Sequence, residues 1–554
     1  MRRVVVTALL GLALACGAHA QLLSVATEPV VLARAALGPE AGSASVAVWR
    51  EGRLGVATVR RAPDAAAVTQ LAAVEPPPLF EIGSISKVFT GVLLAQAVEK
   101  GELGLDDTLG NLLKGKVDFS SADVAAITLR QLMTHSSCLP RQFGSLRGRA
   151  AIVAQIRETN RAVLWAALVS QKLPGKGPCS ALYSNYGVAV VGEVLSDHFG
   201  KPWSVLVRDN IALPLGMSDT VQHLGEKAPR FAPAFDGQLP TTAWDMDAFA
   251  GAGALRSTAS DLVLFGRAIL AGRNGPLAAA AERIVEPLGV YQGVQIGYAI
   301  FVRGTGAKRT YAHDGLTGGY QAQLMLAADT GDVVALLASN VQAPMGQTML
   351  EVLASRYPVN SQAISMDAEQ LRQYAGVYRV NPDLAFVCAV QDGKLYVRAT
   401  RNGFKAYIPV GVDLFTRPAG GAQMRFVRDG NEVVSLQLDQ VGSVTRARRT
   451  SEPVPEPALV AQDLAGAYAG RYVATRFLKS PIEFGVRVEG GQMLVKGGNF
   501  PPTPAFPIPG KPDWFSAEVV PARVHFERDA GGKVSALILH QNGETRALRV
   551  TDSP

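Results

Sequence analysis

Two kinds of hydrophobic pattern divide the chain, and the change from one to the other falls near Pro358. Before it, apolar and polar residues alternate over 43–60, around Glu51-Gly52, and over 320–339, which predicts a β-hairpin at each place. Strands at both ends of this region, with helices between them, predict one α/β unit. The expected helices cover 84–100, 129–135, 186–199, 203–212 and 258–271, and a last one lies near 345–356.

After Pro358 the pattern changes to short alternating strands separated by Gly, Asp and Asn turns, and the sequence repeats itself. FVRDGNEVVSLQL begins at Phe426 and FERDAGGKVSALIL begins at Phe526, an offset of 100 residues at which Val434 also matches Val534. A Pro-rich segment separates the two copies. We therefore expect two small all-β modules, barrels or sandwiches, that arose by duplication.

The first residues have the pattern of a secretion signal, namely Arg2-Arg3, an apolar run, and AHA ending at Ala20. We expect cleavage after Ala20 and an exported protein, periplasmic or secreted; lipidation of Cys16 is the alternative. No transmembrane anchor is expected, because the apolar run is shorter than the roughly 20 residues that a bilayer requires. The predicted organisation is a signal peptide over 1–20, a first domain over 21–357, all-β modules over 365–448 and 463–554, and a Pro-rich linker over 449–462.

Composition limits the classes of function. Of the 554 residues, 48% are hydrophobic and 18% are charged, which is typical of a globular protein with an ample core. The net charge is +7, but Lys and Arg are scattered, so no nucleic-acid partner is expected. The histidines show no metal-binding spacing, and His135 is expected to be a structural residue at a helix end. There is no G-x-S-x-G elbow and no phosphate-binding loop, so we expect neither a metal nor a cofactor.

Ser84-Ile-Ser-Lys87 opens the predicted helix over 84–100. Residues three apart on a helix share one face, so Ser84 and Lys87 would lie about 5–6 Å apart. Ser84 would occupy the first turn, where free N–H groups stabilise negative charge. A lysine held in an apolar pocket loses its proton and then accepts one from a serine hydroxyl. Taken alone, such a pair is common, and most copies are a helix cap and a solvated lysine.

Two further motifs follow in order: YSNYG contains Tyr183 and Asn185, and YAHDGLTGGY contains His313 and Gly315. Together with the Ser-x-x-Lys pair, this ordered set resembles the penicillin-recognising serine hydrolases. That group unites class C β-lactamases, D-alanyl-D-alanine carboxypeptidases, D-aminopeptidases and related esterases. The phrases LRQLMTHSSCLP, NIALPLGMSDT and GAGALRSTASDL also look like this family, and the resemblance covers about residues 27–357.

The resemblance implies a β-lactamase-like (transpeptidase-like) α/β domain with an antiparallel sheet and a helical subdomain, followed here by two all-β barrel-like domains. It implies that Ser84 forms an acyl-enzyme, that Lys87 accepts its proton and that Tyr183 is the acid or base for the leaving group. Asn185 would bind the substrate amide, and the backbone N–H groups of Ser84 and Leu316 would form the oxyanion hole. The phenol of Tyr183 suits its role only if neighbouring cations, such as Lys87, lower its pKa.

The third motif departs from the class C β-lactamases, which have lysine where His313 stands. A lysine supplies a permanent charge for the substrate carboxylate, whereas a histidine is mostly neutral near pH 7. His-x-Gly, here His313 and Gly315, is frequent among the related peptidases and esterases, so efficient lactam hydrolysis is less expected. On a regular strand Asp314 would face away from His313, which favours a structural role for it.

Export makes disulfides possible. If Cys16 is removed, three cysteines remain. A Cys138–Cys179 disulfide around a variable insertion is one expectation, and two buried thiols are the alternative. Cys388 alternates with apolar neighbours and is expected in the core of a strand.

Three functions stay open at this point. The first is an exported hydrolase that acylates Ser84 with a β-lactam or a D-amino-acid peptide and then hydrolyses the acyl-enzyme, so its substrate is a small molecule or a peptidoglycan peptide. The second is a carboxylesterase on the same scaffold, and the third is a non-catalytic cell-wall binding or regulatory protein. The β modules would shape the cleft, bind cell-wall polymer or dock an unknown partner; their sequence shows no obvious aromatic stripe for a carbohydrate.

Overall fold

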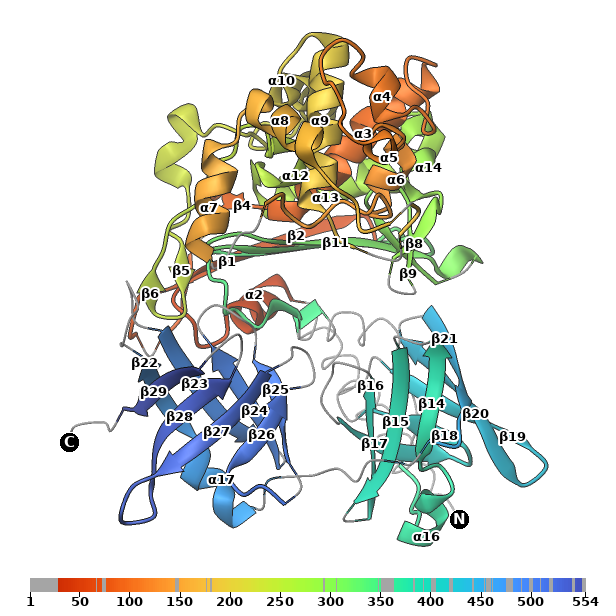
Figure 1. Cartoon of the computed structure of the whole chain (residues 1–554). Coiled ribbons are helices and arrows are strands. Elements are labelled where there is room, and N and C mark those ends of the chain that lie inside the picture. Colours follow the sequence, from red (N-terminus) through yellow and green to blue (C-terminus); the bar gives the residue numbers. More distant parts are fainter. Residues whose placement is uncertain are drawn as a thin grey trace, which may run out of the picture. The chain divides into compact units, whose positions relative to one another are not determined.

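The chain forms two compact units, Met1–Ser355 and Arg356–Pro554, in a computed structural model (Figure 1). The predicted signal peptide and most of the helix expected near 345–356 lie outside the described residues. Described are residues 28–550 apart from 66, 72–75, 145–148, 176, 180–181, 292–293, 305, 347, 350–362, 382–383, 392, 400–404, 418–421, 441–442, 453, 455–459, 461, 475–481, 490, 498–501, 509, 518–521 and 541–543.

An antiparallel sheet of nine strands organises the first unit, in the order β3-β2-β1-β13-β12-β11-β10-β9-β8. The predicted hairpin over 43–60 is confirmed, and its turn residues Glu51 and Gly52 both have positive φ, as a two-residue hairpin turn requires. The bounds are β1 Gly42–Arg50, β2 Arg53–Arg61, β3 Thr69–Leu71, β8 Gly289–Tyr291, β9 Val294–Ile296, β10 Phe301–Arg303, β11 Thr310–Leu316, β12 Gln321–Ala327 and β13 Val333–Ala338.

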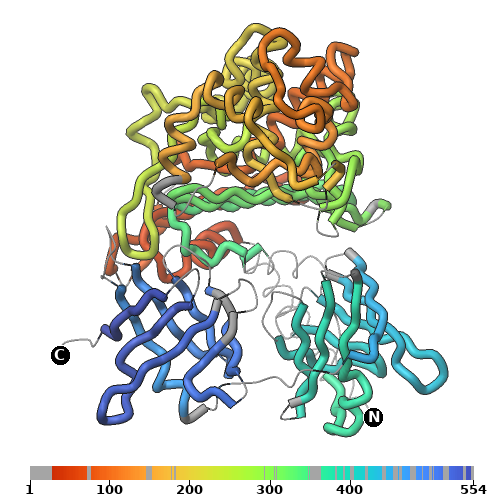
Figure 2. The backbone as a smooth tube through the Cα atoms, in the orientation of Figure 1, coloured from red at the N-terminus to blue at the C-terminus, as the bar shows by residue number. Residues whose placement is uncertain are grey.

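Strands from both ends of this unit pair in the middle of the sheet, as predicted. Val46 of β1 lies opposite Leu336 of β13, and Figure 2 shows these two distant stretches side by side in red and green. Each face of the sheet is covered by helices, so every residue of β13 is buried. Leu336 packs into the core with α2 (Pro29–Leu37), whereas Leu337 packs into the core with α13 (Ala259–Leu270).

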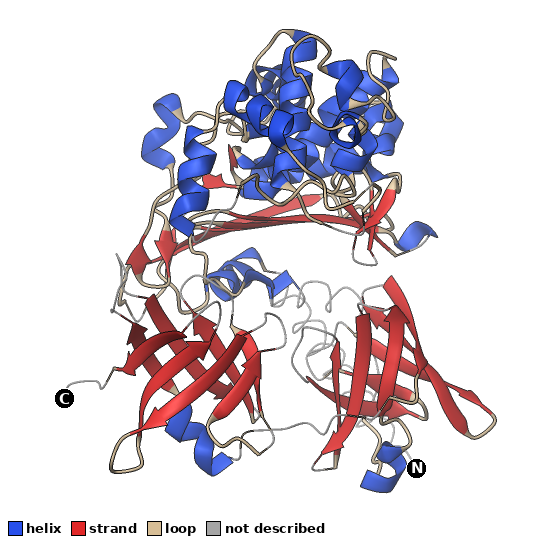
Figure 3. Cartoon of the chain, in the orientation of Figure 1, coloured by secondary structure: helices blue, strands red, loops and turns tan. Residues whose placement is uncertain are grey.

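Most helices of the unit gather on the α13 face of the sheet (Figure 3). The predictions over 186–199 and 258–271 are confirmed, whereas the one over 203–212 is a short α-helix that continues as one π-helical turn. No helix among the described residues is both long and apolar enough to cross a bilayer. The remaining α-helices are α3 Ser86–Glu99, α4 Leu109–Leu112, α5 Ala122–Ala125, α6 Leu129–Met133, α7 Arg149–Glu158, α8 Arg161–Ser170, α9 Asn185–Phe199, α10 Trp203–Val207, α11 Leu213–Leu215, α12 Ala250–Gly253 and α14 Ala279–Val285.

The second unit contains two closed barrels of eight antiparallel strands each, so the predicted β modules are barrels and not sandwiches. A short helix precedes each barrel, α16 (Ala368–Arg372) and α17 (Gln462–Tyr468). The first barrel has β14 Gly376–Asn381, β15 Leu384–Gln391, β16 Lys394–Ala399, β17 Lys405–Gly411, β18 Leu414–Thr416, β19 Gln423–Asp429, β20 Glu432–Gln440 and β21 Ser443–Arg449. The second has β22 Gly470–Ala474, β23 Ile482–Glu489, β24 Gln492–Gly497, β25 Thr503–Pro507, β26 Trp514–Ala517, β27 Ala522–Arg528, β28 Val534–His540 and β29 Glu544–Arg549.

The two barrels share an Arg–Asp pair at equivalent positions, which we call the polar frame and which supports their origin by duplication. Arg428 Nε donates to Asp413 at 2.9 Å in the first barrel, and Arg528 Nε donates to Asp513 at 3.0 Å in the second. Cys388 is buried in the first barrel as expected.

The strand register corrects one part of the predicted alignment. Arg428 lies opposite Val433, and its counterpart Arg528 lies opposite Val534. Along β20 and β28 the offset is therefore 101 residues, because the second hairpin turn is one residue longer. The match of Val434 with Val534 at an offset of 100 is wrong.

Candidate active site

Ser84 lies in a single 3₁₀ turn, η1 (Gly83–Ile85), which leads directly into α3. The short strand β4 (Phe80–Glu81), paired with β7 (Arg256–Ser257), holds the approach to this turn. Ser84 is only half-buried, although its neighbours on both sides are buried. Ser84 is therefore the partly exposed residue of an otherwise buried turn.

The side chain of Lys87 is completely buried beside this hydroxyl. Lys87 Nζ lies 2.9 Å from Ser84 Oγ, and it donates a hydrogen bond of 2.6 Å to the carbonyl oxygen of Ala252 in α12. Burial, assisted by the charge of Arg141, holds the pKa of Lys87 well below its ordinary value of 10.5. An amine that is neutral at this distance from a hydroxyl can accept its proton.

Tyr183 lies next to the same pair. Lys87 Nζ is 5.0 Å from the centroid of its ring, and the guanidinium carbon of Arg141 is 5.1 Å from it. Burial raises the pKa of Tyr183, and the opposing effects of Ser84 and Arg141 are smaller. Arg141 does lower this pKa, but the cost of burying a phenolate is larger, so the condition that cations bring the net pKa of Tyr183 down is not met. Tyr183 is a neutral phenol that holds a proton.

The segment that carries Tyr183 is irregular and is held by the turn that follows α6. Sγ atoms of Cys138 and Cys179 are bonded, and their Cα atoms lie 5.2 Å apart. Closing a loop of this length contributes about 4 kcal/mol in the chain-entropy model. Several hydrogen bonds tie the same two segments together, among them Cys179 N to Ser136 O, Leu182 N to His135 O, Ser184 Oγ to Pro140 O, and Asn185 N to Arg141 O.

His135 is the residue of this turn that touches Tyr183, with ring centroids 4.3 Å apart. Its Nδ1 accepts a hydrogen bond of 3.3 Å from the backbone N–H of Ser184. Burial lowers the pKa of His135 well below its ordinary value, so the ring is neutral. The expected structural role agrees with these contacts, but the contact with Tyr183 could not be seen in the sequence.

Two glycines bring β11 against η1. A Cβ added to Gly315 would lie 1.9 Å from the carbonyl oxygen of Ile82 and 3.2 Å from the backbone nitrogen of Ser84. A Cβ added to Gly83 would lie 2.9 Å from the backbone nitrogen of Leu316. Gly83 also has a positive φ of 48°, which favours glycine. The backbones of η1 and β11 therefore touch without side chains between them, which brings the backbone nitrogens of Ser84 and Leu316 near each other.

His313 is buried on β11, and its ring lies 5.3 Å from that of Phe301. Its Nδ1 lies 2.7 Å from the carbonyl oxygen of Asp314 and donates to it in the neutral ring. Burial lowers the pKa of His313 to about 4, so this residue carries no charge at neutral pH. Asp314 is exposed on the opposite face of the strand, as predicted.

Two further polar side chains border the site. Asn185 is the half-buried first residue of α9, directly after Ser184, whose hydroxyl caps this helix. Arg141 is exposed and lies against Tyr183, and the sequence analysis did not single it out. Arg141 follows Cys138 by three residues. This spacing points to Arg141 as a site residue only when the Cys138–Cys179 disulfide is known, because the disulfide brings this turn to the Tyr183 segment.

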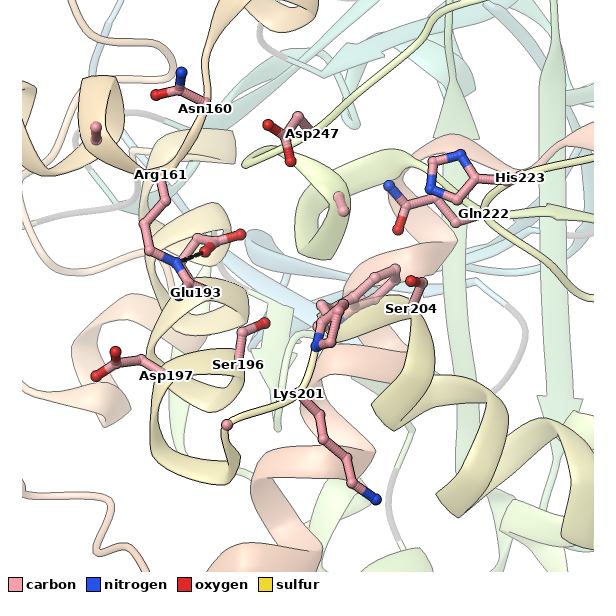
Figure 4. Close-up of a pocket in the computed structure, with 15 residues that line it drawn as sticks. Asn160, Arg161, Glu193, Ser196, Asp197, Lys201, Ser204, Gln222, His223 and Asp247 are labelled. Atoms are coloured by element: carbon pink, nitrogen blue, oxygen red, sulfur yellow. Dashed lines mark hydrogen bonds and ion pairs between the residues drawn. The ribbon is translucent and has the colours of Figure 1, made fainter.

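A separate polar hollow of about 590 Å³ is lined in part by α8, α9 and α10 (Figure 4). Arg161 and Glu193 form an ion pair in its wall, and burial raises the pKa of Glu193 in spite of that partner. None of the predicted site residues lines this hollow. The candidate active site is therefore the junction of η1, α3, β11 and the Tyr183 segment.

Replacing Gly315 by alanine tests the closeness of β11 and η1. The added Cβ would push the two backbones apart, so Gly315→Ala is expected to slow acylation of Ser84 by a serine-directed fluorophosphonate probe about 100- to 1000-fold. Gly175→Ala is the matched control, because a Cβ there meets no atom within 4 Å. An unchanged labelling rate in a folded Gly315→Ala protein would contradict the proposed oxyanion site.

Comparison with known proteins places this site in a family. Residues 33–355 match the Beta-lactamase family model. Penicillin-binding protein 4 of Amycolatopsis lactamdurans is 29% identical over 284 residues, 47% of this chain and 72% of that protein. The D-alanyl-D-alanine-carboxypeptidase/endopeptidase AmpH of Escherichia coli (strain K12) is 30% identical over 184 residues, 33% of this chain and 46% of that protein.

Among solved structures, a beta-lactamase/D-alanine carboxypeptidase from Pseudomonas syringae has the same fold. It superposes with a TM-score of 0.51 at 17% identity, covering 62% of this chain and 99% of that one. The family match covers more than half of the chain. The chain is a serine hydrolase that belongs to the beta-lactamase family, among the penicillin-recognising enzymes.

Proposed function

We propose that the protein is an exported hydrolase that acylates Ser84 with a D-amino-acid-containing peptide or a β-lactam and then hydrolyses the acyl-enzyme. The observation that carries the proposal is the fully buried Lys87 amine, 2.9 Å from Ser84 Oγ. Export is supported by the signal-peptide pattern that ends at Ala20.

In the first step, Lys87 accepts the proton of the Ser84 hydroxyl while Oγ attacks the carbonyl carbon of the substrate. The carbonyl oxygen becomes an oxyanion, which the N–H groups of Ser84 and Leu316 stabilise by hydrogen bonds. Ser84 is in the first turn of a helical segment, where the N–H groups have no acceptor within the helix. The site thus directs partial positive charge at the atom where negative charge develops.

In the second step, the tetrahedral intermediate collapses and the leaving amine needs a proton. Tyr183 is a neutral phenol beside Lys87, so it donates its proton to the amine and recovers one from the lysine. The acyl group stays on Ser84 Oγ. Water then attacks the ester with the same residues in reversed roles, which releases the acid and restores Ser84.

The charges around the site favour a substrate with a free carboxylate. His313 is neutral and cannot supply a permanent positive charge. Arg141, which is exposed beside Tyr183, supplies one. We propose that Arg141 binds the terminal carboxylate of a D-alanyl peptide, and that Asn185 binds its amide. The names of the relatives, penicillin-binding protein and D-alanyl-D-alanine-carboxypeptidase/endopeptidase, agree with such a substrate.

A carboxylesterase is the second candidate, because it needs Ser84, Lys87 and the oxyanion site but no cation for a carboxylate. The neutrality of His313 is the observation that favours it. A non-catalytic role has less support, because Ser84, Lys87, Tyr183 and Asn185 are all present.

Incubation with a chromogenic cephalosporin, followed by intact mass, tests acylation of Ser84. Wild type is expected to gain the mass of the acyl group or to turn the substrate over, and Ser84→Ala is expected to do neither. Ser170→Ala, which removes an exposed hydroxyl of α8, is the matched control. Acylation of Ser84→Ala at the wild-type rate would contradict the mechanism. A wild type that neither hydrolyses nor binds the cephalosporin covalently would favour the esterase.

Replacing Arg141 separates the peptidase from the esterase. Arg141→Ala is expected to raise KM for a D-alanyl-D-alanine peptide about tenfold with little change in kcat, because a charge-assisted contact to the carboxylate is lost. Hydrolysis of an uncharged nitrophenyl ester is expected to stay the same. Arg141→Lys keeps the charge and should retain most of the affinity. Equal losses with both substrates would show that Arg141 supports the site without binding the carboxylate.

A further inference from the structure

Three aromatic rings lie against one another on the second barrel. The ring of Trp514 in β26 stacks on that of His525 in β27, with centroids 4.5 Å apart and planes 11° apart. It also stacks on the ring of His540 at the end of β28, at 4.8 Å and 23°. The strand register explains the meeting, because Trp514 lies directly opposite His525. All three side chains are half-buried.

Both imidazoles lie on the same face of the indole. Rings on opposite faces would be separated by two stacking distances, about 7 Å in total. The centroids of His525 and His540 are only 6.3 Å apart. The indole of Trp514 therefore lies flat across the two histidines, and its other face is turned away from them.

A hollow of about 640 Å³ has Trp514 in its wall, and neither His525 nor His540 lines it. The ammonium of Lys511, an exposed residue of the same hollow, lies 5.7 Å from the centroid of the indole. The wall is otherwise largely apolar, with Leu464, Ile508 and Pro512 among its residues. The hollow thus offers a flat aromatic surface, a largely apolar wall and the ammonium of Lys511, beside the ion pair of Asp513 and Arg528, which also lines it.

The first barrel shows that the fold does not require this arrangement. Leu414 and Arg425, paired in the same register, stand where the second barrel has Trp514 and His525. Asp439 stands where the second barrel has His540, because each lies opposite the equivalent residue of the neighbouring strand. Gly411 stands in the place of Lys511. The polar frame and the strands are nevertheless the same in both barrels. The aromatic surface is therefore an addition to a barrel that folds without it.

We propose that the Trp514 surface binds a glycan with carboxylate groups, of the chemistry of an N-acetylated cell-wall polysaccharide. A pyranose ring has a flat face of C–H groups, and the electron-rich face of an indole attracts their partial positive charge. Lys511 pairs with a carboxylate of the glycan, and the apolar wall accommodates acetyl methyl groups. This binding site is independent of Ser84 and of the proposed hydrolysis.

Calorimetric titration of the full-length protein tests the proposal, with two probes that differ in charge. The first probe is a soluble glycan strand that carries muramyl carboxylates and no peptide, and the second is a neutral N-acetylglucosamine oligomer. Trp514→Leu, which installs the residue of the first barrel, is expected to weaken binding of both about tenfold. Lys511→Gln is expected to weaken only the acidic strand.

The matched control is Val412→Ala, in the corresponding loop of the first barrel, where the side chain is 75% exposed. It should bind both probes as wild type does. The rate at which Ser84 is acylated should be the same in all variants, which shows that each is folded. Absence of binding by wild type, or equal affinities of wild type and Trp514→Leu, would overturn the proposal. Equal effects of Lys511→Gln on both probes would show that the ligand is recognised without its carboxylate.

Discussion

The chemistry of the active site depends on the burial of one amine. Lys87 has no exposed surface, and no carboxylate among the described residues forms an ion pair with it. Keeping a charged amine in such a place costs several kcal/mol, so the lysine loses its proton instead. In the proposed mechanism, the same burial makes the amine the base that accepts the proton of Ser84. Its position at the start of a helix that is buried on nearly every side is therefore the functional feature of α3.

Other elements converge on this amine and its hydroxyl partner without adding a compensating charge. The carbonyl oxygen of Ala252 holds the amine in place. Gly315 lets β11 approach the backbone of Ser84, and the disulfide-linked turn holds the segment of Tyr183 beside them. Each of these contacts is backbone or neutral, so none of them adds a charge next to the amine. Arg141 is the exception: its charge lies at the exposed edge beside Tyr183, where we propose that it binds the substrate carboxylate.

Features that depend on neighbours in sequence could be predicted, and those that depend on folding could not. The alternation over 43–60 and the apolar run after Ser84 are local, and both produced the expected elements. The net pKa of Tyr183 depends on how deeply the fold buries it, so its direction could not be predicted from the sequence. Arg141 approaches Tyr183 only through the folded turn. The rings around Trp514 come from three strands and therefore make no stripe in the sequence.

Titration of the Lys87 amine is the most direct test of the central claim. The protein would be prepared with lysine labelled at the side-chain nitrogen, and the resonance that disappears in Lys87→Arg would be followed by NMR as pH is varied. The structure predicts an amine that titrates well below its ordinary pKa of 10.5, with acylation of Ser84 slowing as the pH falls through that lowered pKa. A Lys87 that is still charged at pH 7 and titrates near its ordinary pKa of 10.5 would contradict its role as the base.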